Sequence, residues 1–529
     1  MKPPRILYTG LYILAFAISF IALVLSATSY TSAQTSDETH YIYIAFGVIF
    51  VALLVLPGQD IPRGMTKSLW VLALFILLSI PFAVLKNALA INRIDAILIF
   101  MRDHDLSDVA SFGWETVFKP IRTFLFLGFI AFISAYIVQP RKKYFNGTVL
   151  GLVLLGACTS PPVNYLWETA FPSKFKSTFD LAGEIAGLDI TAKPAHQRNM
   201  VIFYLESIEQ SYKTLPQTAK AYQPLADFAD QNTQFSEQLQ VTGADITIAG
   251  ILASHCGVPF LTKVSNRYRF KQTSKTEVAE FMPSVWCLGD QLQADGYTLS
   301  YMNGASLQKF SKGAFLRSHG YTRVMGRETL DEQGVDYRKN YFGADDEFLF
   351  QALKTEYETL NAAGKPFVLS MLTTATHSPD GFFDATCMPE DDVVSNIPKG
   401  ISCSVARTLA AIAHMRALPG GDDTIFVVLS DHLSYKNTLY PDLGNMGDQR
   451  RNMLTIADGT AARRIAKTGT HLDIYPTLLE TLGYQLRDHR ANMGISLFSD
   501  TPTLIEQHGQ DKINKLFRNN AAMADYLWR

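Results

Sequence analysis

The sequence predicts two parts in different surroundings: a bundle of membrane-spanning helices, followed by an α/β domain outside the membrane. Hydrophobic residues make up 48% of the 529 residues and charged residues only 18%, whereas soluble proteins average about 25% charged residues. The charges are also uneven, because residues 1–165 hold 12 Lys and Arg with 8 Asp and Glu, and the remainder holds 35 and 41. This division excludes a single soluble globule, a disordered chain and a basic protein that binds nucleic acid.

Five apolar runs in the first part approach or reach the roughly 20 residues that a helix needs to cross a bilayer. They lie near Ile6–Ser26, Tyr41–Leu56, Leu69–Leu85, Ile121–Val138 and Thr148–Val163. The first run also resembles a signal peptide, but the apolar runs that follow it favour an uncleaved anchor. We therefore expect a transmembrane domain of five spans over residues 1–164, and a juxtamembrane helix with a linker over residues 165–198.

The positive charges between the spans indicate the orientation of the chain. Every second loop carries Lys or Arg, namely Lys2, Arg5, Arg63, Lys67, Arg141, Lys142 and Lys143. The loop over residues 29–40 carries neither. The positive-inside rule then places the N-terminus in the cytoplasm, and five spans place everything after Val163 on the other side of the membrane.

The cysteines agree with this orientation, because four of the five lie in the part placed outside. An even number of cysteines is typical of disulfides on the oxidising side of a membrane. Four cysteines allow three pairings, and closeness in sequence favours Cys256 with Cys287 and Cys387 with Cys403. The chain has no C-x-x-C motif, which argues against a zinc ribbon or a thioredoxin-type site.

Strand-like apolar runs alternate with helical patterns over residues 199–485, which is typical of a mainly parallel sheet covered by helices on both faces. Three runs end at residues suited to chemistry. Met200–Leu205 precedes Glu206, Pro366–Thr373 precedes the segment with His377, and Thr424–Leu429 precedes Asp431 and His432. Ligands of open α/β sheets bind at the carboxyl ends of the strands, so these residues are expected to converge.

Glu206, Asp431 and His432 together form an oxygen and nitrogen ligand set that suits one divalent cation. Thr247 follows a Gly-containing turn and precedes a helical pattern, so it is expected at a helix N-terminus, where the dipole favours an alkoxide and a phosphate. A metal on its hydroxyl would lower the pKa of that hydroxyl and make Thr247 a nucleophile. Taken singly, each residue fits a structural role better, and His377 fits a core histidine; together they predict a phosphoryl-transfer site.

Four segments of the chain also resemble one known family. They are Tyr204–Glu209, Thr247–Gly250 with Ala253–Pro259, Ala375–Gly381, and Ser430–Leu433. They are similar to the phosphoglycerol transferase I family of osmoregulated periplasmic glucan synthesis, in the sulfatase-like branch of the alkaline phosphatase superfamily. Lipoteichoic acid synthases are more distant relatives with the same plan of five spans and an external catalytic domain. The match runs in order over about residues 199–485.

The resemblance implies a fold, a place and a reaction. The fold is an α/β/α sulfatase-like catalytic domain over residues 199–485, followed by a C-terminal appendage over residues 486–529. The place is the bacterial inner membrane, with the catalytic domain in the periplasm. In the reaction, metal-activated Thr247 attacks phosphatidylglycerol, releases diacylglycerol and holds phosphoglycerol covalently until a periplasmic glucan hydroxyl takes it. Membrane lipids and the glucan are thus the implied partners.

The resemblance also assigns roles to residues of the reaction centre. Glu206, Thr247, Asp431 and His432 are implied as ligands of a divalent metal, with manganese or zinc favoured and magnesium allowed. Thr247 is implied as the nucleophile as well. His377 matches a histidine that contacts the phosphoglycerol group and protonates a leaving oxygen.

Three further residues are implied for the substrate pocket. Phe310 and Lys312 match positions where the lipoteichoic acid synthases hold a Trp and an Arg against the head group. Lys312 offers a point charge where Arg would offer a fork, so its grip on phosphate is less strict in geometry. Asn303 stands where the synthases have a His, so the pocket does not transfer residue by residue.

Other functions remain open. One is a different lipid head-group transferase, such as a phosphoethanolamine transferase, or a phosphatidylglycerol phosphodiesterase that uses the same threonine and metal. The Ser-Asp-His-Gly-Glu motif of the phosphoethanolamine enzymes is missing, because Leu433 and Ser434 follow His432. A non-catalytic membrane scaffold is the second alternative, and the complete ligand set argues against it. A sulfatase is not expected, because the chain lacks the C/S-x-P-x-R motif that yields formylglycine.

Overall fold

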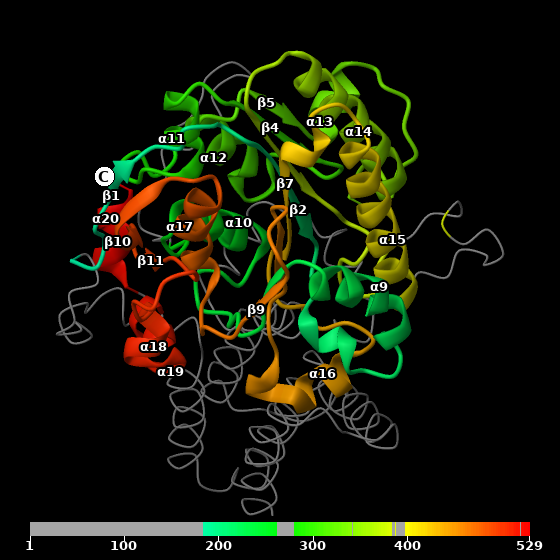
Figure 1. Cartoon of the computed structure of the whole chain (residues 1–529). Helices are drawn as coiled ribbons and strands as arrows, with labels where there is room; N and C mark the ends of the chain where they lie inside the picture. Colours follow the sequence, from blue (N-terminus) through cyan, green and yellow to red (C-terminus); the bar gives the residue numbers. More distant parts are fainter. Residues whose placement is uncertain are drawn as a thin grey trace, which may run out of the picture. The chain divides into compact units, whose positions relative to one another are not determined.

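The computed structural model describes residues 183–261, 280–340, 342–382, 387 and 397–528 except 519. All of them, drawn in colour in Figure 1, belong to one unit of the chain, residues 176–529. The five predicted spans and most of the predicted linker lie outside the described residues. No helix in the described part of the chain is long and apolar enough to cross a bilayer.

A sheet of eight strands forms the centre of this unit, in the order β5-β4-β6-β2-β7-β8-β3-β9. Its strands are β2 (Asn199–Leu205), β3 (Thr233–Phe235), β4 (Thr298–Asn303), β5 (Arg323–Met325), β6 (Phe367–Leu372), β7 (Thr424–Ser430), β8 (Leu454–Ala457) and β9 (Arg463–Ile465). Neighbouring strands from β5 to β7 are all parallel, and β8 is antiparallel to both of its neighbours. The prediction of a mainly parallel sheet is therefore confirmed.

The three strands expected to carry the site lie side by side in the middle of the sheet. Every residue of β6 and β7 is buried, and so is every residue of β2 after the first. Continuous apolar runs are expected for strands that helices cover on both faces. Leu205 pairs with Ser430, and Tyr204 pairs with Leu372. The carboxyl ends of the three strands are therefore level at one edge.

Helices cover both faces of the sheet, as Figure 1 shows. On one face, α9 (Ala219–Asp230), α14 (Asp346–Ala362) and α15 (Ile397–Arg416) share a core with alternate residues of the central strands. On the other face, α10 (Thr247–Cys256) lies against β2, where Tyr204 reaches Ser254 at 2.6 Å, and α10 packs against α17 (His471–Thr481). The eight-stranded sheet and the helices on its two faces thus form a three-layer α/β/α structure.

The flanks of the predicted catalytic domain take part in the same unit. A second sheet joins β1 (Leu188–Ala192), within the predicted linker, to β10 (Gln485–Ala491) and β11 (Gly494–Ile495). Three short helices then end the chain, namely α18 (Leu504–His508), α19 (Gln510–Phe517) and α20 (Ala521–Leu527). Gln510 donates to the carbonyl of Gln240 at 2.9 Å, so the predicted appendage contacts the segment that leads to α10.

Shorter elements complete the unit, and they include α11 (Leu288–Ala294), α12 (Lys312–Ser318), α13 (Arg327–Glu332) and α16 (Tyr440–Met446). Two disulfides join parts of the unit. The structure links Cys256, at the end of α10, to Cys287, which precedes α11. It also links Cys387 to Cys403 of α15. These are the two pairings that closeness in sequence favoured.

Candidate active site

Three buried side chains meet where β2 and β7 end. Glu206 follows β2, and Asp431 with His432 follows β7; none is more than 2% exposed. Nε2 of His432 lies 3.2 Å from Oδ2 of Asp431 and 3.5 Å from Oε1 of Glu206. One ligand atom from each residue lies within 4.8 Å of the others, so the three side chains could hold one metal ion. The structure thus brings together the residues that the strand ends predicted.

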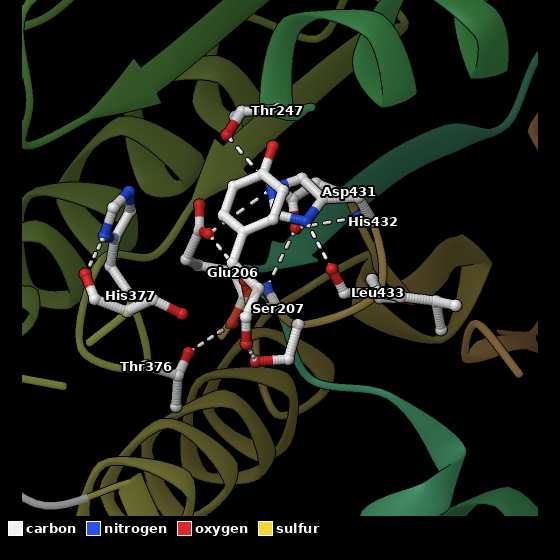
Figure 2. Close-up of polar contacts among 12 residues, drawn as sticks. Glu206, Ser207, Thr247, Thr376, His377, Asp431, His432 and Leu433 are labelled. Atoms are coloured by element: carbon white, nitrogen blue, oxygen red, sulfur yellow. Dashed lines mark hydrogen bonds and ion pairs between the residues drawn. The ribbon is translucent and has the colours of Figure 1, made fainter. Parts of the chain in front are cut away.

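Thr247 completes this group from the opposite helix layer. It is the first residue of α10, and its Oγ1 lies 3.3 Å from Nε2 of His432 (Figure 2). Gly250 lets α10 come this close, because a Cβ at that position would lie 1.7 Å from the main-chain oxygen of Asp431. Thr247 is partly exposed while the other three residues are buried, so Thr247 is the residue of this group that a substrate can reach first.

The ring of His432 is held so that Nε2 is free to bind a metal. Nδ1 lies 2.8 Å from the carbonyl oxygen of Leu433, and a carbonyl only accepts hydrogen bonds, so Nδ1 carries the proton. The lone pair of Nε2 then faces the carboxylates and Thr247, as a metal-bound histidine requires. The ring of Tyr435 stacks on the imidazole at 4.4 Å and prevents it from rotating freely.

The two carboxylates are only partly satisfied by the protein. The main-chain N–H groups of Ser207 and His432 each donate to Oδ1 of Asp431 at 2.9 Å, while Oδ2 is buried without a hydrogen bond. Such a buried, unpaired acceptor costs about 1–3 kcal/mol. Burial, and next the charge of Asp431, raise the pKa of Glu206 well above its ordinary value. A divalent cation would relieve both costs, so these residues fit a metal site.

Three residues with hydroxyl groups surround Glu206 and were not predicted from the sequence. Ser207 adopts a left-handed backbone with φ of 56°, and its hydroxyl donates to Oε1 of Glu206 at 2.8 Å. Oγ1 of Thr373 accepts a hydrogen bond from the main-chain N–H of Glu206 at 3.0 Å, and the hydroxyl of Thr376 donates to the main-chain carbonyl oxygen of Glu206. Together they fix both the side chain and the main chain of Glu206. The only sequence signal for Ser207 is its place directly after a predicted ligand.

His377 lies in the segment after β6, on the far side of Glu206 from His432 in Figure 2. It is partly exposed, and its Nδ1 donates to the carbonyl oxygen of Ser378 at 2.7 Å, since a carbonyl only accepts hydrogen bonds. The ring of Phe342 packs against the imidazole at 4.2 Å. These contacts hold His377 at the rim of the site rather than among the predicted metal ligands.

The residues implied for the substrate pocket include two buried donors without a partner. Lys312 is 6% exposed and makes no hydrogen bond or ion pair with the rest of the described chain. Burial lowers its pKa to about 8, although the charges of Glu206 and Asp431 act in the opposite direction. Asn303 ends β4, and its Nδ2 is also buried and unpaired. Both are suited to bind an anion or a hydroxyl group of a substrate.

Phe310 and Ser311 directly precede Lys312 and form a strained segment. Phe310 and Ser311 have φ of 56° and 57°, in the left-handed region that non-glycine residues rarely adopt. Each such residue costs on the order of 1–2 kcal/mol. Strain of this kind concentrates at ligand-binding segments, and the location of Phe310 in the substrate pocket stays a prediction.

Comparison with known proteins agrees with this architecture. The family model described as Sulfatase matches residues 198–484, which is more than half of the chain. The chain belongs to the sulfatase family. Phosphoglycerol transferase I from Salmonella paratyphi B is 33% identical over 298 residues, which cover 55% of this chain and 38% of that protein. The protein of the same name from Salmonella typhimurium shows the same values.

These relatives confirm the resemblance to phosphoglycerol transferase I that the four segments indicated. This sulfatase-family chain spans 38% of the length of the curated relatives. Among solved structures, a protein of the alkaline phosphatase superfamily from Vibrio parahaemolyticus is 18% identical, with coverage of 69% and 97% of the two chains and a TM-score of 0.47. The lipoteichoic acid synthase LtaP from Listeria monocytogenes is 17% identical, with coverage of 60% and 79% and a TM-score of 0.44.

Proposed function

We propose that the chain is a phosphotransferase that moves phosphoglycerol from phosphatidylglycerol to a periplasmic glucan through Thr247. The observation that carries this proposal is the position of Thr247, a partly exposed residue whose Oγ1 lies 3.3 Å from Nε2 of His432, beside a buried cluster with an unpaired carboxylate oxygen. An accessible hydroxyl beside a cation site is the arrangement that nucleophilic attack on a phosphodiester requires. The relatives named phosphoglycerol transferase I support the choice of phosphoglycerol as the transferred group.

In the first half of the proposed reaction, Oγ1 of Thr247 attacks the phosphorus of phosphatidylglycerol. A bond forms between Oγ1 and phosphorus, and the bond from phosphorus to the diacylglycerol oxygen breaks. Thr247 releases its proton to solvent, and His377 delivers the proton that the diacylglycerol oxygen gains. A divalent metal ion held by Glu206, Thr247, Asp431 and His432, with manganese or zinc favoured, would supply Lewis-acid stabilisation of negative charge on oxygen.

In the second half, a glucan hydroxyl attacks the phosphorus of the phosphothreonine. His377 accepts the proton of that hydroxyl, and Thr247 takes up a proton from solvent as its bond to phosphorus breaks. The ammonium group of Lys312 and the unpaired amide nitrogen of Asn303 bind the phosphoglycerol group in both halves. At neutral pH most Lys312 side chains carry a positive charge, since burial lowers the pKa only to about 8.

We further propose that residues 1–164 anchor the enzyme in a bacterial inner membrane by five spans, with the domain at residues 199–485 in the periplasm. This location brings the catalytic domain to a lipid donor and a soluble glucan acceptor. The two disulfides support it, because disulfides persist mainly in oxidising compartments.

Mass spectrometry of the peptide that holds Thr247 tests the proposal. The full chain is incubated with labelled phosphatidylglycerol and Mn²⁺, and we expect a phosphoglycerol adduct on Thr247 together with free diacylglycerol. Thr247→Ala should abolish both products, while the matched control Thr242→Ala, which removes a hydroxyl five residues earlier, should retain them.

The alternatives give different products in the same assay. An adduct from phosphatidylethanolamine alone would identify a phosphoethanolamine transferase. Release of free glycerol phosphate, with no transfer to an added glucan, would identify a phosphodiesterase. If neither lipid reacts with any divalent metal, the proposed activity is wrong and the scaffold hypothesis gains support.

A further inference from the structure

The peptide group between Leu433 and Ser434 connects the ring of His432 to a buried carboxylate. Its C=O accepts from Nδ1 of His432 at 2.8 Å, and its N–H donates to Oε2 of Glu209 at 2.9 Å. Because a peptide group is planar and rigid, the two hydrogen bonds lie at opposite sides of one fixed unit. The orientation of the His432 ring therefore depends on the position of Glu209.

Arg450 holds Glu209 in place and also binds Ser434. Its Nε donates to Oε1 of Glu209 at 2.9 Å, and its Nη2 donates to Oε2. The same Nη2 also donates to the carbonyl oxygen of Ser434 at 2.7 Å. One ion pair thus binds both main-chain polar groups of Ser434, two residues after His432.

Burial shows that this pair does more than add stability. The side chain of Glu209 is fully buried and that of Arg450 is 12% exposed. Removing two charges from water costs about as much as their attraction returns, so a buried ion pair adds little net stability over an apolar pair of similar size. An apolar pair, however, would leave the N–H and C=O of Ser434 unbound. The charged pair therefore provides directional hydrogen bonds to the main chain of Ser434.

We infer that Glu209 and Arg450 are positioning residues for the proposed metal site, and that Glu209 acts on His432 through the peptide group of Leu433 and Ser434. A metal-binding histidine ordinarily donates its second ring N–H to a carbonyl or carboxylate, which fixes the tautomer and raises the basicity of the ligand. Here the carbonyl oxygen of Leu433 accepts this hydrogen bond from His432 directly. The carboxylate of Glu209, bound to the N–H of the same peptide group, strengthens the bond, since hydrogen bonds in a chain polarise one another.

Two variants of the full chain test this inference. Glu209→Gln keeps the size of the side chain but replaces one acceptor oxygen with a donor that faces other donors. It also leaves the Arg450 charge buried without its partner. The second variant therefore combines Glu209→Met with Arg450→Met, which removes both charges and keeps an apolar side chain at each position.

A second forked ion pair provides the matched control. Arg323 donates to one carboxylate oxygen of Glu356 from Nη2 at 2.7 Å and to the other from Nε. This pair joins β5 to α14 and makes no contact with Ser434. Glu356→Gln thus breaks a more exposed ion pair of the same forked geometry without altering a contact to Ser434.

The measurements are the affinity for Mn²⁺ by calorimetry and the ligand-field spectrum with Co²⁺, which reports the geometry of the histidine ligand. Loss of contacts behind a metal ligand typically weakens metal binding by roughly 10-fold to 100-fold, and we expect this loss with a shifted Co²⁺ spectrum in both Glu209 variants. Glu356→Gln should match the wild type. An unchanged affinity and spectrum in the folded double variant would overturn the inference.

This inference rests on the proposed function only in requiring a divalent metal at the site. The metal titrations contain neither lipid nor glucan, so the two proposals can fail separately. Weaker metal binding in the variants supports the inference even if the wild type transfers no phosphoglycerol. If the wild type forms the Thr247 adduct while the double variant binds metal normally, the inference is wrong and the proposed function stands.

Discussion

Substitution of Gly250 by alanine tests whether the close approach of α10 to β7 creates the site. In the structure, the added Cβ would lie 1.7 Å from the main-chain oxygen of Asp431 and 2.8 Å from its carbonyl carbon, whereas contacts under 3.0 Å are essentially never seen. The helix and the strand end must therefore separate by about 1.3 Å, because neither contact atom belongs to a flexible side chain. Thr247, on the first turn of the same helix, would move with it.

Such a shift should weaken catalysis more than folding. Overpacking of this kind costs typically about 1–3 kcal/mol, and a displacement of about 1 Å at a reaction centre costs on the order of 100-fold in rate. We expect Gly250→Ala to form the Thr247 adduct about 100-fold more slowly while remaining folded by circular dichroism.

Gly444→Ala in α16 is the matched control, because its Cβ would meet no atom closer than 3.5 Å. It should be neutral or stabilising, since alanine is favoured over glycine within helices. Unchanged adduct formation and stability in Gly250→Ala would refute the reasoning.

Three further predictions concern single residues. Asp431→Asn replaces the unpaired Oδ2 with an N–H₂ group 3.2 Å from Nε2 of His432, which can accept a hydrogen bond from it. The metal-free variant should therefore be about 1–3 kcal/mol more stable than the metal-free wild type. Added Mn²⁺ should no longer raise the unfolding temperature of the variant. Lower stability in EDTA would contradict this. Lys312→Met should lower kcat/KM for phosphatidylglycerol by about 10-fold to 100-fold, which is the range for loss of a charged hydrogen bond. The variant should not be less stable, because Lys312 has no partner to lose within the described chain. A large fall in its unfolding temperature would instead show a structural role. Burial lowers the pKa of His255 from 6.5 to about 4. The folded state therefore binds this proton less tightly than the unfolded state, and the free energy of unfolding should fall by about 3 kcal/mol as pH falls from about 6.5 through about 4. His255→Gln should remove this part of the pH dependence in urea unfolding, whereas parallel curves for variant and wild type would disprove it.

The central strands were predicted to within one or two residues because helices cover both of their faces, so their apolar runs are continuous. The short strands β3 and β9 at one edge have three residues each, and their side chains are not uniformly apolar. Such short segments carry no periodic signal, and the antiparallel β8 among them was not predicted. The pairing of β1 with β10 joins residues about 300 positions apart and depends on tertiary packing.

The sequence by itself determined the chemistry of the site. Carboxylates and a histidine directly follow buried strands, and parallel strands present their carboxyl ends at one edge, so the convergence of Glu206, Asp431 and His432 follows from local pattern and sheet geometry. The position of Thr247 follows in the same way from a glycine turn before a helix.

Only the tertiary structure decided how these residues are held. Glu209 and Arg450 are 241 positions apart, and Glu209 reaches Ser434 across 225 positions. Their contacts are made to main-chain groups, which every residue possesses, so the side chains near Ser434 do not reveal them. Local patterns in a sequence disclose which side chains can do chemistry, whereas the contacts that orient them arise when distant segments fold together.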